Sequence, residues 1–161
     1  MNSSETNNQK FKNALEKSKT IAMDGVSSIK KNIDSKSVIR RPSIIVMQYL
    51  QEFGYKVIPI NPSAAGKFIN GEKVFGSLNE VLTPVDIVNV FRPSKEAAEI
   101  AKQAISIKAK ILWLQLGIDN DEAKNISESA NMTYISNRCI KQEYQRLFLK
   151  VNPVFPALKK G

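Results

Sequence analysis

Two short apolar runs in the middle of the chain constrain its fold more than any other feature. They cover residues 85–92 (VDIVNVFR) and 109–117 (AKILWLQLG), and both end on polar residues. Residues 94–107, between the two runs, are predicted to form a helix. Strand, helix and strand in this order make the unit of a parallel sheet that helices cover on both faces. Because such sheets bind ligands beyond the carboxyl ends of their strands, the two polar ends indicate where a ligand should lie.

The remaining elements extend this pattern along the chain. Residues 20–23, 55–60 and 132–135 are predicted strands, and residues 10–19, 42–53, 121–130 and 140–149 are predicted helices. Five strands that alternate with helices through right-handed crossovers predict an α/β fold with one doubly wound parallel sheet. The expected strand order is 3-2-1-4-5, with the switch point beside the first strand.

The 161 residues suit a single domain with a real core. The polar residues 1–9 are expected to be a disordered tail, residues 10–149 to form the domain, and residues 150–161, with Pro153 and Pro156, to be irregular. Residues 29–41 have weak periodicity and many charges, which predicts a loop that is mobile without ligand.

Three smaller signals concern the predicted second strand and the connection that follows it. Pro59 suggests that this strand lies near an edge or a bulge, because proline cannot donate to a ladder. Asn70-Gly71 predicts a turn. Ser77 is expected to cap a short helix, with Glu80 completing a capping box.

Composition excludes several classes of function. The chain has no histidine and one cysteine, so a Ser-His-Asp triad, phosphohistidine chemistry and the usual zinc sites are ruled out. No catalytic residue and no metal ligand is therefore predicted. The single cysteine, the lack of a signal-like N-terminus and the lack of a long apolar run together predict a cytoplasmic protein that has no membrane partner.

The net charge of +9 allows two interpretations. The partner can be polyanionic, either a phosphorylated small molecule or nucleic acid. Alternatively, lysines scattered along the whole chain keep the protein soluble. Nucleic acid is the less expected partner, because aromatic residues are not interleaved with the basic runs and no recognition motif is present.

The predicted sheet places four segments around one ligand crevice: residues 25–28, Asn61-Pro62, Phe91-Arg92 and residues 115–117. The first turn has one glycine, Gly25, where a dinucleotide fingerprint needs three, so NAD binding is disfavoured. A phosphate can still sit on N–H groups after Gly25 or at the helix N-terminus near Ser43. The alternative is that residues 25–28 make a plain turn.

Arg92 also has two interpretations. At the end of a strand it can grip a phosphate in a bidentate manner, or it can be a surface arginine paired with Glu96. Gln115 offers both a donor and an acceptor to a polar ligand edge. Trp113 is expected in the core. Asp86 and Asp119 are expected to be a residue at the start of a strand and a turn residue.

Several dispersed motifs together resemble one family. They are Asn61-Pro62, residues 85–92, residues 113–117 and Arg138-Cys139, and with them the resemblance covers roughly residues 11–147. The chain is similar to small stand-alone CoA-binding proteins, Rossmann-like domains akin to the CoA-binding domain of the succinyl-CoA synthetase α subunit. Their Arg-Pro-Ser-Tyr motif survives here as Arg41-Pro42-Ser43, followed by Ile44, after a longer and more basic segment. Ile140 stands where these proteins usually have proline.

The resemblance implies a protein that binds coenzyme A or an acyl-CoA and has no catalytic machinery of its own. The turn at residues 25–27 and Ser43 would approach the phosphates, and Asn61, Pro62, Phe91 and Arg92 would line the crevice. Crevice and resemblance together predict these binding residues: Gly25, Val26, Ser27, Ser28, Arg41, Ser43, Asn61, Pro62, Phe91, Arg92, Gln115 and Gly117.

Two alternatives remain open beside this interpretation. The chain can be a non-catalytic or partner-dependent subunit of an acyl-CoA ligase or transferase, and it can form a homo-oligomer. Cys139, which follows the last predicted strand, either forms a mixed disulfide with the CoA thiol or packs as a small apolar residue.

Overall fold

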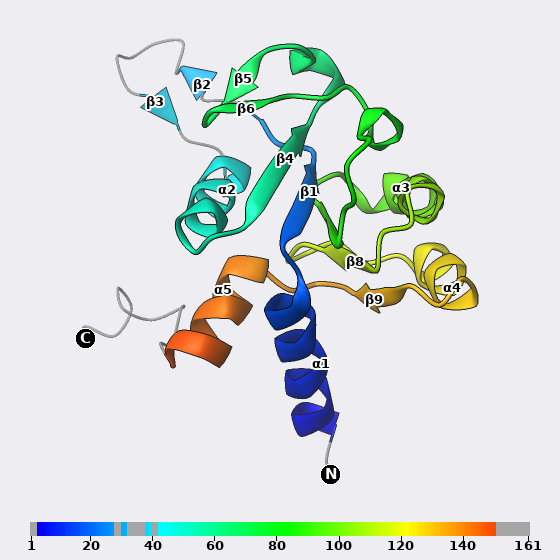
Figure 1. Cartoon of the computed structure of the whole chain (residues 1–161). Coiled ribbons are helices and arrows are strands. Elements are labelled where there is room, and N and C mark those ends of the chain that lie inside the picture. Colours follow the sequence, from blue (N-terminus) through cyan, green and yellow to red (C-terminus); the bar gives the residue numbers. More distant parts are fainter. Residues whose placement is uncertain (1–2, 28–29, 32–37, 40–41, 151–161) are drawn as a thin grey trace.

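A computed structural model describes residues 3–27, 30–31, 38–39 and 42–150 of the chain. Its centre is a five-stranded sheet in which every strand pair is parallel (Figure 1). The strands are β1 (Thr20–Asp24), β4 (Lys56–Ile60), β7 (Ile87–Val90), β8 (Ile111–Leu114) and β9 (Thr133–Ile135). The predicted single α/β domain with five parallel strands is therefore confirmed.

The strand order is β4-β1-β7-β8-β9, which is 2-1-3-4-5 in chain order. The predicted order 3-2-1-4-5 is wrong, although the switch point does lie beside the first strand, between β1 and β7. The physical reason is Pro59, which lies inside β4 and has no N–H for a second neighbouring strand. β4 is accordingly an edge strand, whereas the order 3-2-1-4-5 would have buried it between two others.

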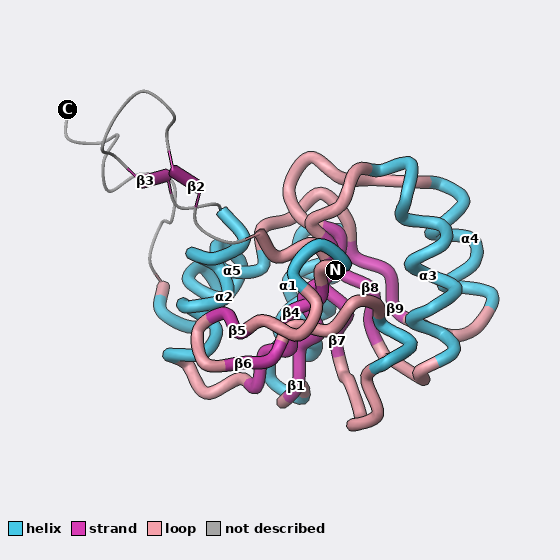
Figure 2. The backbone as a smooth tube through the Cα atoms, turned by 90° about the horizontal axis from the view of Figure 1, so that it is seen from above, coloured by secondary structure: helices cyan, strands magenta, loops and turns pink. Residues whose placement is uncertain are grey.

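Helices cover both faces of the sheet (Figure 2). On one face lie α1 (Ser3–Lys17), α2 (Pro42–Glu52) and α5 (Ile140–Tyr144), which continues into a π-helical turn, Gln145–Leu149. On the other face lie α3 (Ala97–Ser106), preceded by the 3-10 turn Ser94–Glu96, and α4 (Asp121–Ser129).

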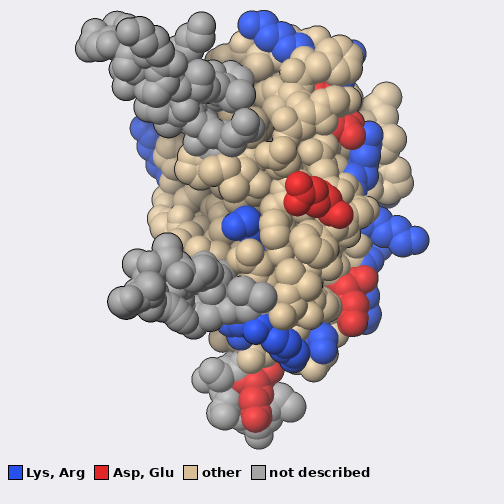
Figure 3. All heavy atoms as spheres, turned by 90° about the vertical axis from the view of Figure 1, so that its left-hand side faces the viewer, with Lys and Arg blue, Asp and Glu red and all other residues tan. Residues whose placement is uncertain are grey.

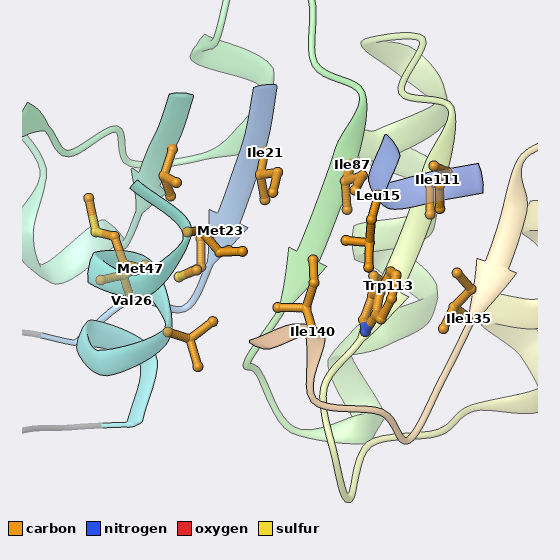
Figure 4. Close-up of a cluster of buried hydrophobic side chains, with 14 of the residues drawn as sticks. Leu15, Ile21, Met23, Val26, Met47, Ile87, Ile111, Trp113, Ile135 and Ile140 are labelled. Atoms are coloured by element: carbon orange, nitrogen blue, oxygen red, sulfur yellow. The ribbon is translucent and has the colours of Figure 1, made fainter. Parts of the chain in front are cut away.

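Alternation along each strand produces two apolar layers, one per face. In β1, Ile21 and Met23 join the cluster under α1, α2 and α5, whereas Ala22 joins the cluster under α3 and α4. Figure 4 shows the first cluster, with Leu15 of α1 and Ile140 of α5 close to the strand side chains. Trp113 is fully buried there, as predicted for a core residue.

Helix α1 begins at Ser3, so most of the segment expected to be a disordered tail is helical. Residues 5–10 are mostly polar and largely exposed, and Gln9 Nε2 donates an i,i+4 hydrogen bond to Asn13 Oδ1 (2.9 Å). Phe11, Ala14 and Leu15 then bury one face against the sheet. A polar helix start has no hydrophobic period to reveal it, which is why the pattern placed the start at residue 10.

Two other predicted segments differ from the structure or lie partly outside it. Within residues 29–41, predicted as a loop, β2 (Lys30–Lys31) and β3 (Val38–Ile39) pair antiparallel, and the other residues of that segment lie outside the described ones. The same is true of residues 151–161, most of the segment predicted to be an irregular tail.

The connection from β4 to β7 carries a 3-10 turn, Pro62–Ala64, and a small hairpin, β5 (Phe68–Ile69) and β6 (Glu72–Lys73). The predicted turn at Asn70-Gly71 joins these two strands, with φ of 48° and 82°. The predicted capping box is wrong: Leu78–Glu80 is a 3-10 turn, Ser77 makes no side-chain cap, and Glu80 instead accepts a hydrogen bond from the N–H of Gly76 (3.0 Å).

Candidate functional site

A crevice opens at the switch point of the sheet, beyond the carboxyl ends of β1, β4 and β7. Its volume is about 360 Å³, and its walls include Asp24, Ile60, Pro62, Arg92, Glu96 and Ile100. This is the place where an open α/β sheet binds its ligand. Pro62 and Arg92 were predicted at the crevice and line it, whereas Asp24 and Glu96 were not in the predicted binding set.

Gly25 lies where the ends of β1, β4 and β7 meet. The residue has a φ of +104°, in the left-handed range that favours glycine, and its N–H donates to the carbonyl oxygen of Ile60 (2.9 Å). A Cβ atom here would stand 3.0 Å from Cδ of Arg92 and 3.2 Å from the carbonyl carbon of Phe91. Gly25 therefore allows the turn after β1 to pack directly against the end of β7.

Arg92 is held by two carboxylates. Its Nε donates to Oε1 of Glu96 (2.8 Å), and one terminal nitrogen lies 2.6 Å from the same oxygen. The other terminal nitrogen lies 3.8 Å from Oδ1 of Asp24, which is deep in the protein. Of the two interpretations of Arg92, the structure contains the pairing with Glu96, and it adds the contact with Asp24.

Asp24 is the last residue of β1, and its side chain is 6% exposed. The pKa of Asp24 is raised to about 6: burial is the main cause, the nearby positive charge of Arg92 partly offsets it, and the negative charge of Glu96 adds to it. A buried carboxyl group with a shifted pKa in a ligand crevice is a candidate functional group. The sequence signal was an acidic residue between the predicted strand at residues 20–23 and Gly25.

The turn after β1 is tied to the start of α2 and to the end of β4. The N–H of Ser27 donates to Oγ of Ser43 (3.0 Å), which is buried in the first turn of α2. Nδ2 of Asn61 donates to the carbonyl oxygen of Val26 (2.8 Å). Oδ1 of Asn61 accepts from the N–H of Ser63 (2.8 Å) and so caps the 3-10 turn after β4. These bonds bring four of the predicted binding residues, Val26, Ser27, Ser43 and Asn61, together around one turn.

Gln115 and Gly117 follow β8 and do not line the crevice. The Gln115 side chain is buried, and its Oε1 accepts from the N–H of Ile140 (3.1 Å) and from Nδ2 of Asn89 (3.3 Å). The N–H of Gly117 donates to Oδ1 of Asn137 (2.7 Å). Both residues connect β8 to the segment before α5. The predicted binding residues Ser28 and Arg41 lie outside the described residues.

Other residues singled out in the sequence have structural roles. Oδ2 of Asp86 accepts from the N–H groups of Lys19 (2.8 Å) and Thr20 (3.0 Å), so it joins the starts of β7 and β1. Asp119 accepts from the Tyr134 hydroxyl (2.7 Å) in the turn before α4. Both predicted placements are confirmed. Cys139 is half-buried against the cluster under α1, α2 and α5.

Charge on the surface is mixed. Figure 3 shows basic side chains at several separate places on one face of the molecule, with acidic side chains between them. Among the described residues, no helix has both the length and the apolar character needed to cross a membrane.

Comparison with known proteins identifies relatives of the whole domain. Residues 19–145 match the model of a family described as "CoA binding domain". The chain is 34% identical over 131 residues to the uncharacterized protein YneT of Bacillus subtilis (strain 168). The aligned residues make up 81% of this chain and 89% of YneT.

Solved structures agree with this match. A Thermus thermophilus protein superposes with a TM-score of 0.76 at 32% identity, over 92% of this chain and all of the other. A hypothetical protein of Pyrococcus horikoshii OT3 superposes with a TM-score of 0.75 at 31% identity, over 87% of this chain and 91% of that one. From its fold and from these matches, the chain belongs to the CoA-binding domain family.

Proposed function

We propose that this protein binds coenzyme A or an acyl-CoA in the crevice at the carboxyl ends of β1, β4 and β7, and that it has no catalytic machinery of its own. Family membership supports association with CoA in general. The turn at Gly25 carries the proposed location, because it joins the end of β1, the end of β7 and the N-terminus of α2.

We place the ligand across the carboxyl ends of the strands at this turn, so that it reaches both faces of the sheet. On the α2 side, the first helical turn contains Ser43 and has no acidic residue, so it suits the negative charge of the pyrophosphate. On the α3 side, the crevice beside Pro62 and Arg92 accommodates another part of the ligand. The absence of histidine in the chain supports binding without phosphohistidine chemistry.

Thermal unfolding with CoA, dephospho-CoA and NAD in parallel tests the proposal. A ligand that binds the folded state alone stabilises it by about 2.7 kcal/mol at a hundredfold excess over Kd. We expect CoA to raise Tm and NAD to raise it less. Equal or larger stabilisation by NAD, or none by CoA, would contradict the proposal.

A pair of serine variants locates the site. Ser43→Ala should reduce the CoA-induced rise in Tm, because it removes a hydroxyl from the turn that we propose for the phosphates. Ser106→Ala is the matched control, since its hydroxyl donates to the carbonyl oxygen of Lys102 at the end of α3 and is exposed. Equal CoA-induced rises in the two variants would place the phosphates elsewhere.

A further inference from the structure

Asp24 is a buried carboxylate that also faces the candidate ligand crevice. Its residue is 4% exposed, and it lines the crevice at the end of β1. Within the described part of the chain, its charged partner is Arg92 at 3.8 Å, a distance too long for a hydrogen bond. The carboxylate faces the crevice and is not one of the fully enclosed side-chain groups that lack a partner in the described part of the chain, so it can accept a hydrogen bond from a donor that enters the crevice.

The charges around Asp24 argue against a phosphate as the ligand group that lies against its carboxylate. Arg92 comes from the end of β7, but Glu96 takes its Nε and one terminal nitrogen. The turn and helix beyond it contribute one further cation, Lys95, and two carboxylates, Glu96 and Glu99. An anion entering here would meet three carboxylates and two cations, of which one is already engaged.

From this arrangement we propose that Asp24 accepts a hydrogen bond from an uncharged N–H group of the bound ligand. The inference rests on the proposed function, because CoA carries such donors on both of its arms. They are the amide groups of pantetheine and the exocyclic amine of adenine. A carboxylate accepts these donors strongly, since charged acceptors form shorter and stronger bonds than neutral ones.

Two further observations agree with this role. Along β1, Met23 points to the layer under α2, so the next residue, Asp24, points to the opposite layer under α3. Asp24 and the turn at Ser43 thus lie on opposite sides of the sheet, which separates the proposed pyrophosphate site from the ligand group that donates to Asp24. With a pKa raised by burial to about 6, Asp24 is ionised at neutral pH and ready to accept.

Calorimetric titration of CoA into wild type, Asp24→Ala, Asp24→Asn and Glu122→Gln tests the inference. Loss of a hydrogen bond to a charged group is expected to weaken binding by Asp24→Ala about ten- to a hundredfold. Asp24→Asn keeps an acceptor oxygen and should lose less. Glu122→Gln removes a charge at an exposed position in the first turn of α4, away from the crevice, and should not change the affinity for CoA.

Fragments identify the arm. Pantetheine and adenosine 3′,5′-bisphosphate are titrated separately, and the fragment that loses affinity for Asp24→Ala carries the donor. If wild type binds CoA and Asp24→Ala binds it equally or more tightly, the inference is overturned and the proposed function stands. If wild type binds neither CoA nor its fragments, the proposed function and this inference both fail.

Discussion

Arg92 packs its side-chain stem over Gly25, at a distance that leaves no room for a methyl group between them. A Cβ atom on Gly25 would lie 3.0 Å from Cδ and 3.3 Å from Cγ of Arg92. The carbonyl carbon of Phe91, which is backbone and cannot rotate away, would be at 3.2 Å. The turn after β1 can therefore pack this closely against the end of β7 only because residue 25 has no side chain.

Gly25→Ala is accordingly expected to destabilise the fold. The substitution places an alanine at φ +104°, and a non-glycine residue in a sparsely populated region of backbone space costs on the order of 1–3 kcal/mol. The contact with Phe91 and Arg92 adds to this cost. Urea denaturation monitored by tryptophan fluorescence measures the change in the free energy of unfolding.

Gly66→Ala separates the two causes. Gly66 also has a positive φ, +86°, but a Cβ there would have no neighbour within 4 Å. Its variant should show the backbone strain alone. If Gly66→Ala costs as much as Gly25→Ala, the close approach of β7 contributes nothing and only the backbone conformation matters.

The alternation of strands and helices could be predicted from the sequence, whereas the strand order could not be obtained from that pattern. Periodicity is a local property, and both 3-2-1-4-5 and 2-1-3-4-5 are doubly wound orders with right-handed crossovers. Pro59 was the one residue that distinguished them. Its missing N–H suggested a position near an edge or a bulge, and only the second order places β4 at an edge.

The part of the candidate site that lies at strand ends could be predicted, because the strand ends themselves could be predicted from the sequence. Pro62 and Arg92 follow neighbouring strands and line the crevice, and Gly25, which follows β1, packs against Arg92. Gln115 also follows a strand, but its amide turns inward to the N–H of Ile140, a tertiary contact that no sequence pattern indicates. Asp24 was missed because its burial depends on the elements packed around it rather than on its neighbours in the sequence.

Arg92→Ala is expected to weaken CoA binding about tenfold while the protein stays folded, because a charge-assisted contact at a strand end is lost. Calorimetric titration measures the affinity. Glu96→Gln is the matched comparison, since it breaks the same ion pair but leaves the guanidinium in the crevice. An equal loss in both variants would mean that Arg92 acts only through its pairing with Glu96.

Asp86→Ala is expected to destabilise the sheet without changing CoA affinity. The Asp86 carboxylate accepts from the N–H groups of Lys19 and Thr20 at the start of β1, on the edge opposite the crevice. Removing it leaves both donors without this partner, at a cost of about 1–3 kcal/mol. Chemical denaturation measures the stability, and titration of CoA measures the affinity. A weaker affinity under conditions where the variant is fully folded would contradict this prediction.

Asp24 should make stability depend on pH. Burial raises its folded pKa to about 6, above the ordinary value of 3.8. Between these values the folded state holds the proton more tightly than the unfolded state. The stabilising contribution is therefore fully present below about pH 4 and is lost as pH rises through 6, with a size on the order of 3 kcal/mol.

Comparison with Asp24→Asn, which does not titrate, isolates this contribution. The free energy of unfolding of Asp24→Asn minus that of wild type is expected to increase between pH 4 and pH 7. Asp86→Asn should show the opposite sign. Burial raises the pKa of Asp86, but the two N–H donors and the charge of Lys110 outweigh it and leave the pKa below its ordinary value. Its stabilising contribution is present above the unfolded pKa and is lost as pH falls, so the advantage of wild type over Asp86→Asn should shrink on acidification. Parallel curves for wild type and Asp24→Asn across this range would show that the Asp24 carboxyl titrates as it does in water.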